Sequence, residues 1–197
     1  MKSYSQSNQD LFALHTSRYK QNGFFLEIGS NHPINHNNTY ILEKNYNWKG
    51  CMVEYDKSFE PLYKIHRQNS IYCMEDARIV KYREIMDHNN FPLNMDYLQI
   101  DLDVNNRSTI DTLRLLDNTV FDKYKFASIT FEHDIYTGNY FNTQAESRSI
   151  FEKRGYLLVF PNVSVYYLGK NCVYEDWYIH PELVDVEYAK TFVNILK

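Results

Sequence analysis

The stretch Phe24-Phe25-Leu26-Glu27-Ile28-Gly29-Ser30-Asn31 decides how the rest of the chain is interpreted. Four apolar residues around one acid predict a short buried strand, and Gly29 marks a turn directly after it. In doubly wound α/β folds, a strand that ends at glycine forms a cofactor cradle, because glycine lets the backbone approach a ligand closely. The alternative is an ordinary first strand of any α/β domain. The stretch lacks a Gly-x-Gly-x-x-Gly fingerprint, which disfavours a pyrophosphate cofactor.

The bulk composition predicts one globular domain that spans residues 1–197. The net charge of −4 gives no electrostatic reason to expect a nucleic acid or an anionic membrane as partner. No apolar run approaches the ~20 residues of a membrane span, and the first residues resemble no signal peptide. Cys51, Cys73 and Cys172 are too unevenly spaced for a zinc motif or a disulfide framework. These features predict reduced thiols and a cytoplasmic protein.

The hydrophobic pattern predicts alternating strands and helices after an N-terminal helical segment (1–22). Short strands are expected at 24–28, 51–54, 70–73, 96–103 and 126–132. Two further strands, 156–160 and 163–168, are separated by Pro161-Asn162 and predict a hairpin. A C-terminal loop and helix are expected over 171–197. Together these elements predict an α/β fold with a mixed, mostly parallel sheet of about seven strands and flanking helices.

Acidic residues end the second and fourth predicted strands. Glu54 follows the Gly29 turn by the 20 to 30 residues at which an acid typically binds both hydroxyls of a ribose. Asp101 and Asp103 end the fourth strand, and in an open α/β sheet that edge faces the ligand crevice. The alternatives are an exposed turn acid for Glu54, and a helix cap for one of the two aspartates.

Glu132-His133-Asp134, at the end of the fifth predicted strand, is the strongest chemical signal in the chain. With Asp101 opposite, it predicts a catalytic cluster in which His133 is the general base and a carboxylate orients it. Asp101, Glu132 and His133 could instead hold Mg²⁺ or Mn²⁺, which would lower the pKa of a hydroxyl group. A purely structural hydrogen-bonded cluster is the third interpretation.

Several short motifs follow one another in the order seen in one enzyme family. They are Ser5-Gln6-Ser7-Asn8-Gln9-Asp10, Glu27-Ile28-Gly29-Ser30-Asn31, Asn38-Thr39-Tyr40 with Leu42-Glu43, Trp48-Lys49-Gly50, Val53-Glu54, Asp96 to Asp101, and Glu132-His133. In these motifs most of the chain resembles the FkbM-type S-adenosylmethionine-dependent O-methyltransferases. Two positions depart from the family pattern. His32-Pro33 replaces Asp-Gly in the cofactor loop, and Asp103-Val104 replaces Glu-Gly after the fourth strand.

The resemblance implies a Rossmann-like class I methyltransferase that uses S-adenosyl-L-methionine. The implied acceptor is a sugar hydroxyl, for example of a deoxyhexose such as rhamnose or fucose in a glycan. A non-catalytic glycan- or nucleotide-binding module is the alternative. The residues expected to bind the cofactor are Gln6, Glu27, Gly29, Ser30, Asn31, Thr39, Glu54, Asp76, Ala77 and Asp101.

The acceptor is expected to contact a different set of residues. They are Asp103, Asp134, Asp176 and Trp177. Trp177 belongs to the aromatic segment Trp177-Tyr178, and amphipathic rings beside acids suit the faces of sugars. Packing of the same rings in the core is the rival interpretation.

Overall fold

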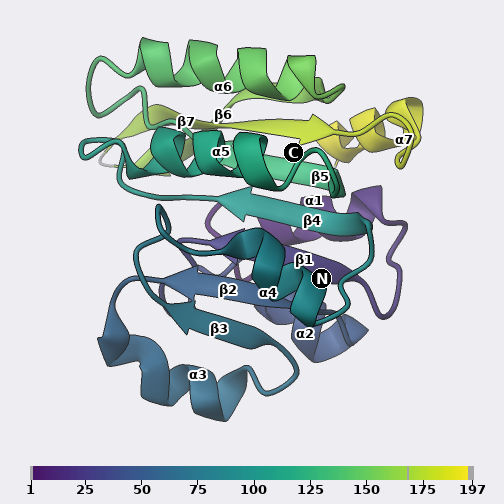
Figure 1. Cartoon of the computed structure of the whole chain (residues 1–197). Coiled ribbons are helices and arrows are strands. Elements are labelled where there is room, and N and C mark those ends of the chain that lie inside the picture. The colour runs from purple at the N-terminus through teal and green to yellow at the C-terminus, as the bar shows by residue number, and fades with distance from the viewer. Residues whose placement is uncertain (1, 168, 195–197) are drawn as a thin grey trace.

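The computed structural model describes residues 2–167 and 169–194, so the predictions for Met1, Leu168 and the last three residues lie outside the described residues. Its centre is a seven-stranded sheet in the order β3-β2-β1-β4-β5-β7-β6 (Figure 1). The strands are β1 (Phe24–Ile28), β2 (Lys49–Glu54), β3 (Ile71–Met74), β4 (Asn94–Ile100), β5 (Lys125–Glu132), β6 (Leu157–Tyr167) and β7 (Lys170–Ile179). Strands β1 to β5 are parallel, and β7 is antiparallel to both of its neighbours. The mixed α/β sheet predicted from the sequence is confirmed.

Helices cover both faces of the sheet. They are α1 (Gln9–Thr16), α2 (Tyr40–Tyr46), α3 (Glu60–His66), α4 (Tyr82–His88), α5 (Ser108–Thr119), α6 (Phe141–Lys153) and α7 (Val186–Lys190), with 3₁₀ turns η1 (Lys57–Phe59) and η2 (Thr191–Asn194). Figure 1 shows α4 and α5 in front of the sheet and α1 behind it. Core residues of α4, α5 and α6 pack on the front face, whereas those of α1, α2 and α3 pack on the back face. No helix in the described ranges is both long and apolar enough to cross a membrane.

Side chains along each strand alternate between the two faces of the sheet, and this decides which residues join which core. In β1, Leu26 and Ile28 face the front core, whereas Phe25 faces the back core. Glu27 has the parity of Phe25 and therefore lies on the back face. Most of these strands are buried on both sides, which explains why they read as short apolar runs in the sequence.

The C-terminal hairpin differs from the one predicted. Residues on both sides of Pro161-Asn162 form one long strand, β6, and the register against β7 shifts near these two residues. Asn162 has a φ of 59°, a local irregularity that bends the strand without reversing it. The partner strand is β7, which covers residues for which a loop was predicted. The sequence of β7 is rich in Tyr, Trp and acids, so it lacks the aliphatic pattern of the earlier strands.

Candidate active site

The Gly29 turn joins three strands at their C-terminal ends. The φ of Gly29 is +83°, and a Cβ atom added there would lie 1.7 Å from the carbonyl oxygen of Asp101. The backbone N–H groups of Gly29 and Ser30 both donate to the carbonyl oxygen of Val53, at 2.9 and 3.1 Å. Only glycine fits this position, because a side chain would collide with the backbone that leaves β4.

Glu54 ends β2 and points at the loop after the Gly29 turn. Its Oε2 atom accepts the backbone N–H of Asn31 at 2.6 Å, and its Oε1 atom accepts the N–H of Asp56 at 2.7 Å. The side chain is only partly buried, and Asn31 is exposed. Glu54 and the loop after the Gly29 turn therefore meet at one accessible edge of the sheet.

A cavity of about 330 Å³ lies between the ends of β2, β3 and β4. Tyr55, Asp76, Ala77, Leu102 and Asp103 are among the residues that line it. Asp76 pairs with Arg78 at 2.6 Å, and hydrogen bonds from Arg78 lower the pKa of the Asp76 carboxyl. Asp103 is exposed, and its Oδ1 atom accepts the N–H of Asn105 at 2.8 Å. The cavity has apolar walls with acids at its rim.

Glu27 and Thr39 lie beneath this edge in a buried network rather than on its surface. Glu27 accepts hydrogen bonds from the Thr39 hydroxyl at 2.7 Å and from the N–H of Asn38 at 3.0 Å. Arg67, which is 1% exposed, donates to Thr39 at 2.6 Å and to Glu43 at 2.9 Å. Glu27 and Thr39, which were predicted to bind the cofactor, thus take part in a network that holds the loop after the Gly29 turn, and the sequence analysis missed Arg67 at its centre.

Ser30 and Gln6 also differ in their access to a ligand. Ser30 is buried, and its hydroxyl donates to the carbonyl oxygen of Val53 at 3.2 Å and accepts from the Tyr63 hydroxyl at 2.6 Å. Gln6 is exposed in the segment before α1. Ser30 therefore supports the turn, whereas the Gln6 side chain is accessible.

Three carboxylates form a row across β4, β5 and β7 on the back face. The register pairs Ile100 with Phe131, which places Asp101 beside Glu132, and it pairs Glu132 with Glu175 directly. Burial and the charge of Glu175 raise the pKa of Asp101 well above its ordinary value. Burial also raises the pKa of Glu175 to about 7. Asp101 and Glu175 therefore hold their protons to higher pH than ordinary acids do.

His133 lies on the opposite face from this row, because consecutive strand residues point to opposite sides. Its side chain is fully buried, with Nε2 at 3.1 Å from Nε2 of Gln144 in α6 and at 3.6 Å from Oδ1 of Asp176. The predicted cluster of Asp101, Glu132 and His133 is thus divided between the two faces. Among the described residues, no group of three or more His, Cys, Asp or Glu side chains is arranged to hold a metal ion.

Asp176 and Trp177, expected at the acceptor, are both fully buried. Burial alone would raise the pKa of Asp176, but hydrogen bonds from His133, Arg148 and the N–H of Asn162 lower it to about 2. The Trp177 ring stacks on Phe12 of α1 with centroids 4.8 Å apart. The core interpretation of this aromatic segment therefore describes the structure, and neither side chain presents a face to an acceptor.

Glu175 is a residue of the candidate site that the sequence analysis did not select. Its Oε1 atom accepts Nε2 of Gln9 at 2.9 Å, and its Oε2 atom accepts Nε1 of Trp177 at 2.5 Å. The available signal in the sequence was that Glu175 and Trp177 lie two residues apart, as residues on one face of a strand do. This spacing indicates nothing when the segment is interpreted as a loop.

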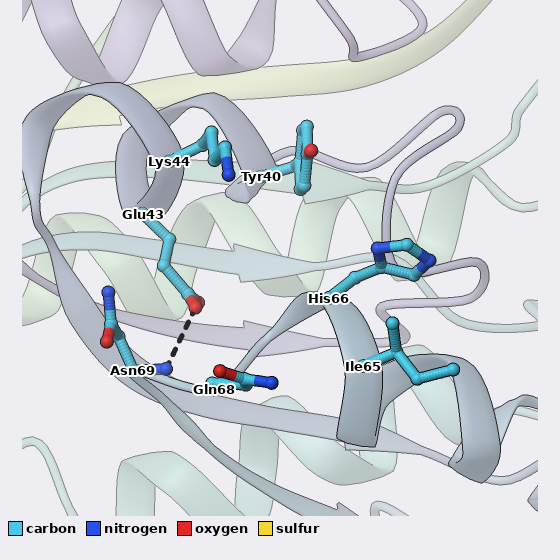
Figure 2. Close-up of a pocket in the computed structure, with 7 residues that line it drawn as sticks. All are labelled: Tyr40, Glu43, Lys44, Ile65, His66, Gln68 and Asn69. Atoms are coloured by element: carbon cyan, nitrogen blue, oxygen red, sulfur yellow. Dashed lines mark hydrogen bonds between the residues drawn. The ribbon is translucent and has the colours of Figure 1, made fainter.

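A second hollow lies away from these acids. A cavity of about 220 Å³ lies between α2, α3 and the segment before β3 (Figure 2), and there Glu43 accepts the N–H of Asn69 at 3.1 Å. Because Asn69 precedes β3, this hollow lies toward the N-terminal edge of the parallel strands. None of the predicted site residues lines it.

Comparisons with known proteins support the fold assignment. No family profile matches the sequence, and no curated protein matches it. Human methyltransferase-like protein 13, solved in complex with S-adenosylhomocysteine, is similar in structure, with a TM-score of 0.56, 12% identity, and coverage of 96% of this chain and 90% of that one. Precorrin-6y C5,15-methyltransferase from Geobacter metallireducens has a TM-score of 0.55, 13% identity and 86% coverage of both chains.

A third similar structure is a putative rRNA-methylase from Clostridium thermocellum, with a TM-score of 0.53, 10% identity, and coverage of 91% of this chain and 99% of that one. The three similarities support one fold assignment. The chain has the Rossmann-like fold of class I methyltransferases.

Proposed function

We propose that this protein is an S-adenosylmethionine-dependent O-methyltransferase and that its acceptor is a sugar hydroxyl. The observation that carries the proposal is the contact of Gly29 with Asp101, with Glu54 at the adjacent strand end. The class I methyltransferase fold and the ordered motifs of the FkbM-type family support it. S-adenosylmethionine supplies a methyl group on a positively charged sulfur, and the carboxylates of Glu54 and Asp101 at this edge suit a cationic ligand.

In this proposal Glu54 accepts hydrogen bonds from the ribose hydroxyls. Asp76 and Ala77 line the 330 Å³ cavity, which suits the flat and mainly apolar adenine ring. The Asp76 carboxylate accepts hydrogen from the exocyclic amine, while Arg78 keeps it ionised. Gly29 and Asn31 form the backbone wall between these two acids.

The acceptor lies on the other side of Asp101, near Glu132 and the loop after β5. Methyl transfer to a hydroxyl requires that the acceptor oxygen approach the methyl group in line with the carbon–sulfur bond, and that the hydroxyl proton be removed. A carboxylate can accept that proton. An acidic surface accepts hydrogen bonds from neutral polyols and repels phosphates, so a deoxyhexose such as rhamnose or fucose in a glycan fits better than a nucleic acid.

Transfer of a labelled methyl group from S-adenosylmethionine to deoxysugar oligosaccharides tests the proposal. Label in the sugar fraction, absent when either substrate is omitted, supports it. Binding of S-adenosylhomocysteine without transfer to any acceptor in the panel would instead support a non-catalytic binding module. A nucleotide that binds more tightly than S-adenosylhomocysteine would contradict the cofactor assignment.

A further inference from the structure

Asp134 occupies a constrained position at the acceptor side of the sheet edge. It follows β5 directly, and its backbone N–H donates to the carbonyl oxygen of Tyr174 at 3.0 Å. Its φ is 47°, in the left-handed region where aspartate is several-fold enriched among residues other than glycine. The hydroxyl and N–H of Thr137 both donate to the Asp134 carbonyl at 2.9 Å and close the turn. These backbone contacts therefore fix the position of the Asp134 Cα atom, from which the side chain extends.

The carboxyl of Asp134 has an unused hydrogen-bond acceptor. Its Oδ1 atom is buried and has no hydrogen-bond partner among the described residues. The same holds for Oε1 of Gln99, a 1% exposed side chain whose Nε2 donates to Asp101 at 3.2 Å. Unpaired buried acceptors are unfavourable until a donor reaches them. Two of them near Asp101 indicate a ligand with hydroxyl or ammonium groups.

Titratable residues at the ends of β4 and β5 and within β7 surround Asp134. Asp101 directly follows β4, Asp103 lies in the same loop, His133 precedes Asp134, and Glu175 is in β7. Burial raises the pKa of Asp134 to about 6, with His133 opposing and Asp103 adding to the shift. The group is therefore mostly ionised at neutral pH but accepts a proton more readily than an ordinary aspartate.

We propose that Asp134 is the residue that removes the proton from the acceptor hydroxyl, in place of His133, whose Nε2 faces Gln144 and Asp176 on the other side of the sheet. This inference rests on the proposed function. The reaction joins the acceptor oxygen to the methyl carbon and breaks the carbon–sulfur bond, with both electrons going to sulfur. The hydroxyl proton passes to Oδ1 of Asp134. The backbone hydrogen bond from the N–H of Asp134 to the carbonyl oxygen of Tyr174 holds the residue in place.

The test compares Asp134→Asn with Glu152→Gln, a charge-matched change at an exposed position of α6. Asp134→Asn is expected to lose about 10²–10⁴-fold in kcat and to bind S-adenosylhomocysteine as the wild type does. Glu152→Gln keeps the wild-type kcat. Equal kcat in Asp134→Asn and wild type, or a larger loss in His133→Gln, overturns the proposal.

A ¹³C NMR titration of the aspartate carboxyls gives a readout that does not depend on turnover. We expect one resonance that titrates near pH 6 in the wild type and is missing in Asp134→Asn. Loss of a resonance that titrates near ~4 would overturn the assignment. Failure of the wild type to bind S-adenosylhomocysteine overturns the proposed function as a whole. Binding without any methyl transfer overturns only the catalytic assignments.

Discussion

Gly29 and Asp101 approach so closely that a Cβ atom on Gly29 would lie 1.7 Å from the Asp101 carbonyl oxygen. The N–H of Asp101 donates to the carbonyl oxygen of Ile28 at 2.9 Å, so the contact is part of the pairing of β1 with β4. The N–H of Gly29 donates across to Val53 in β2. This one turn therefore sets the positions of Asp101 and Glu54 relative to each other.

Gly29→Ala is expected to destabilise the protein and to abolish binding of S-adenosylhomocysteine. Gly155→Ala is the matched control, because Gly155 also has a positive φ, of +85°, but an added Cβ would lie 3.7 Å from Nε2 of His180, an ordinary contact distance. The control should cost about 1–2 kcal/mol for the left-handed backbone. Gly29→Ala should cost about 1–3 kcal/mol more because of the collision. Equal unfolding free energies in urea would contradict the close approach.

Arg67→Met should destabilise the fold by about 3–5 kcal/mol, because it leaves Glu27 and Glu43 buried without their cation. Arg78→Met breaks an ion pair whose side chains are 41% and 26% exposed, and should cost less than about 1 kcal/mol. Urea unfolding of both variants measures the difference. A loss of less than about 1 kcal/mol in Arg67→Met would show that the network does not hold the cofactor loop.

Glu175 should make stability depend on pH. Its folded-state pKa of about 7 lies above its ordinary value of 4.5, so the folded protein holds this proton more tightly than the unfolded chain. The stabilisation is complete below about pH 4.5 and is lost as the pH rises through 7. Glu175→Gln should flatten this decline between about pH 4.5 and 7, because the variant has no carboxyl proton to lose. Parallel curves for the two proteins between pH 5 and 8 would contradict the assignment.

Asp176 provides the opposite pH dependence. Its pKa is lowered to about 2, so its contribution is present above the ordinary value of 3.8 and is lost as the pH falls through 2. Asp176→Asn should therefore be less stable than the wild type at neutral pH, and the gap should narrow below about pH 3. Unfolding curves measured from pH 2 to 6 check this. A constant gap over that range would indicate a packing effect instead.

The first strands of the sheet were predictable because their sequence signals are local. Phe24 to Ile28 is a short apolar run with glycine after it, and Glu54 follows at a typical interval. Short apolar runs of this kind were enough to predict the five parallel strands. A C-terminal antiparallel hairpin is present as β6 and β7, but the predicted position of its turn was wrong. Pro161-Asn162 is a turn signal in most contexts, whereas here it sits in a bulge of an edge strand, where proline is tolerated.

The candidate site was only partly predictable, because face and burial depend on the complete sheet. Glu132 and His133 are adjacent in sequence and lie on opposite faces, which follows from strand alternation once β5 extends to Glu132. Glu27 looks like a ligand-binding acid in the sequence. Its partner Arg67 is 40 residues away, and no local pattern connects the two.

The binding of S-adenosylhomocysteine, measured by calorimetry, tests the central claim most directly. The wild type should bind one molecule per chain. Glu54→Gln should bind at least tenfold more weakly, because hydrogen bonds to a charged group contribute ~1.5–3 kcal/mol. Glu84→Gln, a change at an exposed residue of α4, should bind as the wild type does. No heat of binding in the wild type, or equal affinity in Glu54→Gln and wild type, would contradict a cofactor site at the Gly29 turn.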